Sequence, residues 1–417
     1  MIRHIAGKEI LENITSYRFF ILTGMLAALM AVSVIVGYGD YELRMENFNL
    51  NRPKPQTSNV MIPPAPVSIF AKGVDAHLGR LHYITSMWIE VQDVEQSVNR
   101  LFSLFTVPDM LFVIKVMLSL IALLFSFDAV TGEKESGTMK LALSNGMSRS
   151  AMLFGKLLGR LALVFVPFAI LFVAAALVIS LMPDVPASAD YWNRVLFILA
   201  ASGVYVALFT ALGLFLSSLV HASPTSLILS CAVWVMFIFV IPEMGSTIAR
   251  TVADVPPSDR IEMEHRLANV RAIYERIHRE NTTNGAEVAR RMVEQIRDAN
   301  SAIAESYRPR LNGLIRLSRS IVQVSPAGAL SFALTDAAGT GVYEELRYKD
   351  AVSGFAARNF EPINDLSKAE MEDFRYDRAP IQEVVLQSAG FDCAVLVTFS
   401  LLFLALAMMR VLRYDPR

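Results

Sequence analysis

Residues 127–160 read FDAVTGEKESGTMKLALSNGMSRSAMLFGKLLGR, and this charged loop lies between two long apolar segments. A membrane protein can reverse its direction within a handful of polar residues. This loop instead carries acids, bases, a helix-start signal and a second short amphipathic run. Its content therefore indicates a segment that another molecule binds from the aqueous side.

The composition indicates an integral membrane protein. Of the 417 residues 54% are hydrophobic and only 18% are charged, and the mean hydropathy is +0.43, whereas soluble chains carry roughly 25% charged residues. The net charge of −1 suggests no nucleic-acid partner. No histidine pair has metal-ligand spacing, so no metal site is predicted. Cys231 and Cys393 fall inside apolar segments and are interpreted as buried free thiols.

Six apolar windows approach the roughly 20 residues that a helix needs to cross a bilayer core. They are Phe19–Tyr38, Pro108–Phe127, Leu157–Met182, Val195–Leu219, Ser226–Ile241 and Gly390–Met409. The predicted fold class is an all-α membrane protein with six transmembrane helices, an N-terminal amphipathic elbow helix and two mainly helical extracytoplasmic inserts.

The distribution of basic residues predicts the orientation, because short cytoplasmic segments are enriched in lysine and arginine. The side that holds both termini carries Arg3, Lys8, Arg18, Lys134, Lys140, Arg149, Lys156, Arg160, Arg410, Arg413 and Arg417, whereas the short loop 183–194 has only Arg194. We therefore expect a multi-pass protein of the cytoplasmic (inner) membrane with both termini and the 128–156 loop in the cytoplasm.

This orientation divides the chain into five predicted regions. They are 1–38 (elbow helix and first span), 39–107 (first extracytoplasmic insert), 108–241 (spans two to five with the loop 128–156), 242–389 (second extracytoplasmic insert) and 390–417 (sixth span and cytoplasmic tail). Together the two inserts make up more than half of the chain.

The inserts have different predicted structures. In the first insert, a proline-rich linker precedes a mainly helical stretch at Val67–Leu104. In the second, apolar residues at helical spacing and a helix start at Ser258 predict a helical hairpin over about 258–323. The hairpin is either a docking arm or gate for an extracytoplasmic protein, or a stabilising cap without a specific partner.

Motifs for catalysis are lacking in the sequence, which has no phosphate-binding loop, zinc helix or nucleophile elbow. The chain is therefore expected to be a non-catalytic subunit that binds no ATP of its own. Lys115 is the one clear charge inside a predicted span. It is a candidate for facing a translocation path, and the alternative is a side chain that extends to the outer interface without a role in transport.

Within the loop, Ser136 is a candidate N-cap for a short helix at Thr138–Leu143, and Ser148 can cap the helix that continues into the third span. The short helix would then lie across the cytoplasmic face, joined at both ends to membrane spans. A push on it would reach spans two and three directly.

Here the sequence resembles the ABC-2 type permeases, the transmembrane subunits of ATP-binding cassette (ABC) transporters. The resemblance rests on Glu133-x-x-Ser136-Gly137-Thr138-Met139-x-Leu141, Ser144, Ser148-Arg149 and Gly155-Lys156, on Lys8-Glu9 and Tyr17-Arg18-Phe19-Phe20 at the head, and on Ser325-Pro326 and Leu334-Thr335 to Gly341. The chain is most similar to members with large extracytoplasmic inserts, such as permease components associated with copper-enzyme maturation.

The resemblance implies that two permease subunits, identical or homologous, pair as a dimer and that each docks a coupling helix on a separate ABC ATPase subunit. ATP and magnesium would bind to that partner chain, and the direction implied is export. It assigns ATPase contact to Glu133, Glu135, Ser136, Gly137, Thr138 and Met139. The alternative for these residues is a solvated loop with ordinary helix capping.

Two other functions stay open at this point. The chain could be a mechanotransmitter that conducts no solute and passes ATP-driven motion to an extracytoplasmic partner, as the size of the inserts allows. It could also be a membrane anchor or assembly subunit without a link to ATP.

Overall fold

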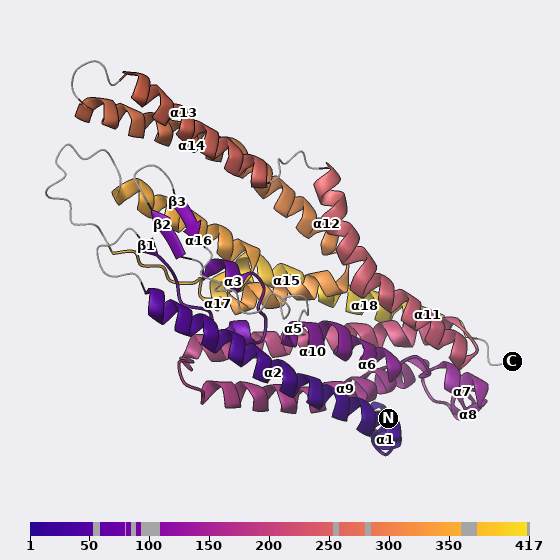
Figure 1. Ribbon diagram of the computed structural model, residues 1–417. Helices are drawn as coiled ribbons and strands as arrows, with labels where there is room; N and C mark the ends of the chain where they lie inside the picture. The colour runs from indigo at the N-terminus through magenta and orange to yellow at the C-terminus, as the bar shows by residue number, and fades with distance from the viewer. Residues whose placement is uncertain are drawn as a thin grey trace.

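The computed structural model describes residues 1–52, 59–79, 81–84, 89–92, 109–252, 258–279, 285–359 and 373–414. The protein is mostly helical and elongated, as Figure 1 shows. The N-terminus, the end of the last helix and the two short helices α7 (Thr131–Glu135) and α8 (Thr138–Ser144) lie at one end, which we call the termini end. The inserts lie at the opposite end, which we call the insert end.

Among the residues that the structure describes, five helical segments are long and apolar enough to cross a membrane. They are Tyr17–Asn51 (α2), Arg149–Ser180 (α9), Ala189–Leu219 (α10), Ser223–Gly245 and Ile381–Leu412. The predicted span Pro108–Phe127 corresponds to a shorter apolar helix, Met110–Leu124. Its 15 residues extend about 22 Å at 1.5 Å per residue, less than the roughly 30 Å of a bilayer core. The described residues thus show five spans of full length and one shorter apolar helix, and the prediction of six spans is not confirmed.

Three of these apolar segments contain a π-helical stretch. The shorter one comprises α5 (Met110–Phe112), η2 (Val113–Leu118) and α6 (Ser119–Leu124). Ser223–Gly245 comprises α11 (Ser223–Val235), η3 (Met236–Val240) and the start of α12 (Ile241–Val252). The last comprises α17 (Ile381–Val384), η4 (Val385–Ala389) and α18 (Gly390–Leu412).

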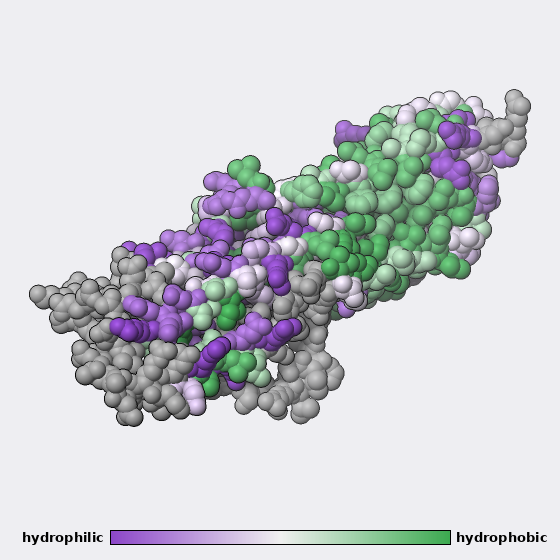
Figure 2. All heavy atoms as spheres, turned by 90° about the horizontal axis from the view of Figure 1, so that it is seen from above, coloured by the Kyte–Doolittle hydropathy of each residue, from purple (hydrophilic) through white to green (hydrophobic). Residues whose placement is uncertain are grey.

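Helix α10 is the centre of the bundle. Its side chains are apolar on all sides, and Tyr205, Phe209 and Leu212 are 0–1% exposed, as expected for a helix that is surrounded by other helices. By contrast, α2 and α9 bury one side and expose apolar residues such as Ile35 and Ile170 on the other. Figure 2 shows apolar residues gathered over the part of the surface that the spans form, and hydrophilic residues over the insert end.

In the first insert, the helix predicted at Val67–Leu104 is wrong for the described residues. They form a 3₁₀ turn η1 (Pro66–Ile69), a single helical turn α3 (Asp75–Leu78) and an antiparallel sheet of β1 (Asn59–Val60), β2 (Leu81–Ile84) and β3 (Ile89–Gln92). Asn59 pairs with Tyr83, and Leu81 pairs with Gln92. The alternating pattern of β2 and β3, with β-branched and aromatic residues, favours strands over a helix.

In the second insert, the predicted hairpin corresponds to α13 (Ser258–Arg279) and α14 (Gly285–Val322), which pack side by side (Figure 1). Two further helices follow, α15 (Pro326–Ala338) and α16 (Val342–Asn359). At the base of α14, Arg319 pairs with Asp336 of α15 at 2.9 Å and with Asp392 of α18. The hairpin is thus joined to the bundle by buried charges.

The two inserts fold together as one body. Val60 and Leu78 of the first insert share a buried cluster with Tyr348 and Phe355 of the second. The N–H of Val74 also donates to the carbonyl of Thr340 at 2.9 Å. The segments that share this core are more than 250 residues apart, and a contact of this kind gives no local sequence signal.

Candidate coupling site at the termini end

The loop between the apolar segments forms two short helices, α7 (Thr131–Glu135) and α8 (Thr138–Ser144). The helix predicted at Thr138–Leu143 is confirmed, and so is the cap at Ser148, whose hydroxyl accepts from the N–H of Ala151. The predicted N-cap at Ser136 is wrong, because Gly137 occupies that position with φ of +70°. The left-handed conformation favours glycine and turns the chain sharply between the two helices.

Helix α7 begins against the end of α10. The hydroxyl of Ser217 accepts hydrogen bonds from the N–H groups of Val130 and Thr131, both at 3.0 Å. The hydroxyl of Ser226 in α11 donates to the carbonyl of Phe127 at 2.6 Å. These contacts satisfy backbone groups that a helix start leaves without intrahelical partners, and they fix the start of α7 to two spans.

The end of α7 holds the turn between α10 and α11. Lys134 donates to the carbonyls of Ser218 at 2.7 Å and Val220 at 3.0 Å. Glu135 accepts from both the backbone N–H and the hydroxyl of Ser223, at 2.8 and 2.7 Å. These hydrogen bonds from Ser223 lower the pKa of the Glu135 carboxyl. A cation at a helix C-terminus and an anion at a helix N-terminus match the direction of the helix dipoles.

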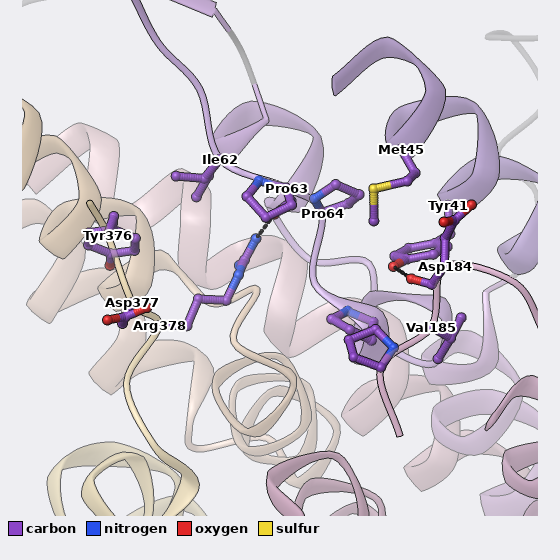
Figure 3. A pocket seen from close by; sticks show the side chains of 12 residues that line it. Tyr41, Met45, Ile62, Pro63, Pro64, Asp184, Val185, Tyr376, Asp377 and Arg378 are labelled. Carbon is purple, nitrogen blue, oxygen red and sulfur yellow. Dashed lines mark hydrogen bonds between the residues drawn. The ribbon is translucent and has the colours of Figure 1, made fainter. Parts of the chain in front are cut away.

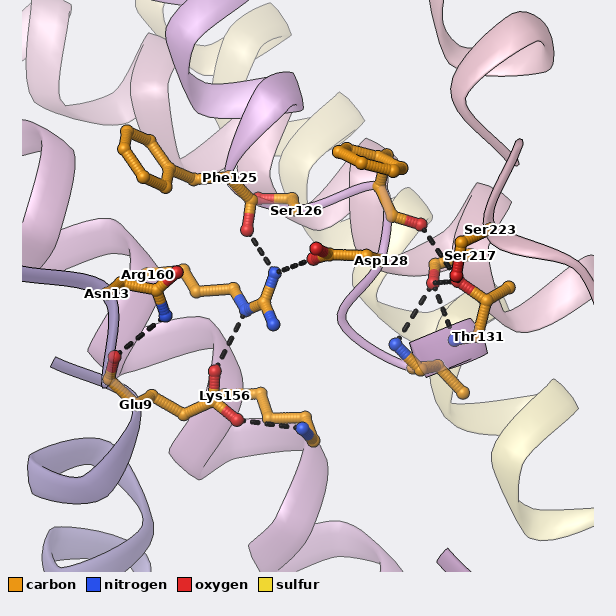
Figure 4. A network of polar contacts seen from close by, with 12 residues as sticks. Glu9, Asn13, Phe125, Ser126, Asp128, Thr131, Lys156, Arg160, Ser217 and Ser223 are labelled. Atoms are coloured by element: carbon orange, nitrogen blue, oxygen red, sulfur yellow. Dashed lines mark hydrogen bonds and ion pairs between the residues drawn. The ribbon is translucent and has the colours of Figure 1, made fainter. Parts of the chain in front are cut away.

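A buried ion network joins α1 (Ile2–Ile14) to the loop and to α9 (Figure 4). Glu9 pairs with Lys156 at 2.7 Å and with Arg160 at 3.0 Å. Lys156 also pairs with Glu133 at 2.7 Å, and Arg160 with Asp128 at 2.8 Å. Lys156 and Glu9 are only 2% and 6% exposed, so these charges are largely withdrawn from water.

The pKa of Glu9 reflects two opposing effects. Burial favours the neutral acid and raises the pKa, whereas the positive charges of Arg160 and Lys156 and their hydrogen bonds lower it. The attractions prevail, and the net pKa lies below its ordinary value. Glu9 is therefore ionised at neutral pH and holds the two cations of α9 against α1.

Two glycines of α9 allow α1 to approach closely. A Cβ atom on Gly155 would lie 2.7 Å from the side chain of Ile5, and one on Gly159 would lie 2.9 Å from the carbonyl oxygen of Ala6. The Gly-x-x-x-Gly spacing places both glycines on one face of α9, as in other closely packed helix pairs. Helix α1 is thus joined to α9 by backbone proximity as well as by charge.

The six residues for which ATPase contact was predicted differ in their exposure and in their contacts. Ser136 and Thr138 are exposed, and Gly137 is half-buried. Glu135 is exposed but bonded to Ser223, and Glu133 points to Lys156 with 27% of its side chain exposed.

Met139 differs from the other five. It is 0% exposed and packs with Val130, Leu153 and Val411. Its side chain thus lies in the interior of this chain, and its contact with an ATPase stays a prediction. The exposed apolar residue of α8 is Leu141, which is 65% exposed.

Lys115 lies in η2, outside this site, and its side chain is partly buried. Its carbonyl accepts hydrogen bonds from Tyr205 at 2.8 Å and Ser119 at 2.6 Å. Its ammonium forms no ion pair with the residues that the structure describes. A translocation role for Lys115 stays a prediction.

Several residues of the site were missed from the sequence. They are Glu9, Asp128, Lys156, Arg160, Ser217 and Ser223. One signal was available, since Lys156 and Arg160 are four residues apart at the start of an apolar helix and adjoin the Gly-x-x-x-Gly spacing. Two cations on one face of a buried helix need a carboxylate from another segment to balance their charge. Nothing in the sequence indicates that Glu9 provides that carboxylate.

Comparison with known proteins adds independent information. A family model described as ABC-2 family transporter protein matches residues 3–415. The chain is 31% identical over 125 residues to a protein of Stutzerimonas stutzeri named "Probable ABC transporter permease protein NosY", a match that covers 30% of this chain and 45% of that protein. It is 40% identical over 73 residues to a Pseudomonas aeruginosa protein of the same name, covering 17% and 26% of the two chains. The matched segment thus spans less than half the length of either relative.

Proposed function

The chain belongs to the ABC-2 family of transporter proteins, and from this premise we propose that it is the permease subunit of an ABC transporter. It moves a substrate across the cytoplasmic membrane, with export as the direction, while a separate ABC ATPase subunit hydrolyses ATP. The termini end faces the cytoplasm and the inserts face outward. The observation that carries this proposal is the family match over nearly the whole chain, which includes α7 and α8.

In this proposal the exposed part of α8 contacts the ATPase. Ser136, Gly137 and Thr138 offer polar and backbone contacts, and Leu141 adds an apolar side chain. Glu133, Glu135 and Met139 act behind that surface, because their side chains fix α7 and α8 to the spans. A second permease subunit completes the membrane unit.

The helical hairpin is proposed to bind an extracytoplasmic protein. On α13, Met263, Leu267, Val270 and Tyr274 are 57–62% exposed. Their spacing of four, three and four residues is that of a coiled-coil seam. An exposed apolar stripe of this kind supports contact with a helix of a partner protein.

Affinity purification of the full chain in mild detergent is the first test, and we expect an ABC ATPase to co-purify. The pair would then be reconstituted in proteoliposomes, and ATP turnover and solute movement measured. Solute movement supports transport, whereas ATP turnover without movement of any solute would favour the mechanotransmitter.

The contact surface is tested with two matched glycine variants. Gly137 and Gly146 both have positive φ angles, and neither has an atom within 4 Å of an added Cβ. Gly137→Ala and Gly146→Ala therefore carry similar backbone strain, but only Gly137 belongs to the proposed contact. We expect Gly137→Ala alone to lower ATP turnover in the complex. Equal turnover in both variants and the unmodified protein would overturn the assignment.

A further inference from the structure

A concave site lies at the insert end, remote from α8. The cavity has a volume of about 690 Å³, within the range of sites that bind small molecules. Four separate segments line it: helix α2, residues 62–66, residues 184–186 and residues 376–378 (Figure 3). Because the segments come from both inserts, one span and the loop between α9 and α10, the cavity exists only in the folded chain.

The walls of the cavity are apolar and poor in hydrogen-bond donors. They include Pro63, Pro64, Pro66 and Pro186, with Met45 beside them. Proline has no backbone N–H group and contributes only a carbonyl acceptor. The walls therefore fit an apolar body, and their polar atoms mostly accept hydrogen bonds.

The charged groups of the cavity give a negative excess. Asp184 and Asp377 line it, are exposed, and their carboxylates form no hydrogen bond or ion pair with residues that the structure describes. Among the described residues that line the cavity, the one cation is Arg378, and its guanidinium already has partners. It pairs with buried Asp75 at 3.0 Å and donates to the carbonyls of Gly339 at 2.6 Å and Pro63 at 2.9 Å.

The backbone conformation of Asp184 fixes the position of this residue opposite Asp377. Asp184 has a φ of +62° and is the one residue other than glycine with positive φ in the described part of the chain. That conformation costs most residues roughly 1–2 kcal/mol and is better tolerated by Asp and Asn. The hydroxyl of Tyr41 fixes it by donating to the Asp184 carbonyl at 2.8 Å. In Figure 3, Asp184 and Asp377 lie on opposite sides with the prolines between them.

We propose that this cavity binds an amphipathic organic cation, an apolar body that carries an ammonium group. The proline and methionine walls receive the body, and the free carboxylates of Asp184 and Asp377 attract the charge. An ammonium group only donates hydrogen bonds, which matches a lining that mostly accepts them. The site does not depend on the proposed transport function, since neither the ATPase nor α8 takes part in it.

The test compares the binding of three probes that share the same apolar body. The protein is the purified full chain in nanodiscs of uncharged lipid. The probes are 3-phenylpropylammonium, 3-phenylpropan-1-ol and 3-phenylpropionate, and binding is measured by isothermal titration calorimetry against empty nanodiscs. We expect the ammonium to bind at least about tenfold more tightly than the alcohol, and the carboxylate to show no binding. Higher salt should weaken the binding of the ammonium only.

Variants then locate the binding. Asp184→Asn keeps a residue that tolerates the left-handed conformation, and Asp377→Asn removes the second charge. We expect each to weaken ammonium binding about tenfold, whereas Asp298→Asn on exposed α14 should leave it unchanged. Equal affinity for alcohol and ammonium, or unchanged ammonium binding in both cavity variants, would overturn the proposal. So would the absence of ammonium binding at millimolar concentration.

Discussion

Replacing Glu9 should release α1 from the rest of the molecule. Glu9 pairs with Lys156 and Arg160, and all three side chains are at most 8% exposed. Glu9→Ala leaves both cations in place without the acid that joins them to α1. The lost free energy is mainly that of docking α1 on the bundle, because α1 lies at the start of the chain and contacts chiefly α9.

The size of this loss of docking free energy depends on the ion pairs that remain in Glu9→Ala. Removing one partner from a buried ion pair costs about 3–5 kcal/mol. The lower value applies here, because Lys156 keeps Glu133 at 2.7 Å and Arg160 keeps Asp128 at 2.8 Å. At about 1.4 kcal/mol for each factor of ten, a loss of about 3 kcal/mol raises the undocked population of α1 roughly a hundredfold.

Hydrogen exchange of the α1 amides, followed by mass spectrometry in detergent, measures this population. The matched control is Glu12→Ala, since Glu12 pairs with Lys8 at 3.5 Å and the two side chains are 59% and 68% exposed. A surface pair of this kind contributes about 0–1 kcal/mol. If α1 exchanges at the same rate in the Glu9 and Glu12 variants, the buried network does not hold the helix.

The same contact predicts a pH dependence. The folded pKa of Glu9 lies below its ordinary value of 4.5, so its stabilising effect is complete above pH 4.5 and is lost as the pH falls through the folded pKa. After correction for intrinsic exchange rates, the protection of α1 should be constant from about pH 7 to 5 and decrease below about 4.5. A decrease of the same size in Glu9→Gln would show that another group titrates.

Three further predictions concern other contacts. Gly159→Val should displace α1, because the Cβ of the new side chain would lie 2.9 Å from the carbonyl oxygen of Ala6. Gly132→Val is the control, since its Cβ would meet no atom within 4 Å. Hydrogen exchange of the α1 amides distinguishes the two variants. Glu135→Gln should weaken the hydrogen bonds to Ser223, and we expect severalfold faster exchange at the start of α11 with α1 unchanged. Leu267→Glu should abolish co-purification of an extracytoplasmic partner without lowering the melting temperature, since Leu267 is 60% exposed.

Local signals predicted much of the membrane part. The apolar windows identified the long helices, and helix α8 was predicted within one residue of its end because its start and stop signals are adjacent in the sequence. The second window extends beyond the helix at its end, since Phe125 to Phe127 follow α6, whereas Pro108 lies outside the described residues. Hydropathy reports apolar composition and does not report where a helix ends.

The rest depended on contacts between distant segments. The strands of the first insert are short, and they pack against a core completed by Tyr348 and Phe355, so their environment could not be inferred from residues 67–104. From the sequence, Lys156 was interpreted as a cytoplasmic basic residue and as part of a motif. Its two acids lie at Glu9 and Glu133, and long-range ion pairs of this kind have no fixed spacing in a sequence.

The position of α7 and α8 changes which spans a force on α8 would reach. The sequence suggested only the two spans that the loop connects. In the structure Lys134 and Glu135 hold the turn between α10 and α11. Met139 packs with Val411 of α18, and Lys156 links the loop to α1. A displacement of α8 cannot move α9 alone without breaking buried charges and a packed core. We therefore expect α8, α1 and the termini-end parts of α9, α10, α11 and α18 to move as one unit.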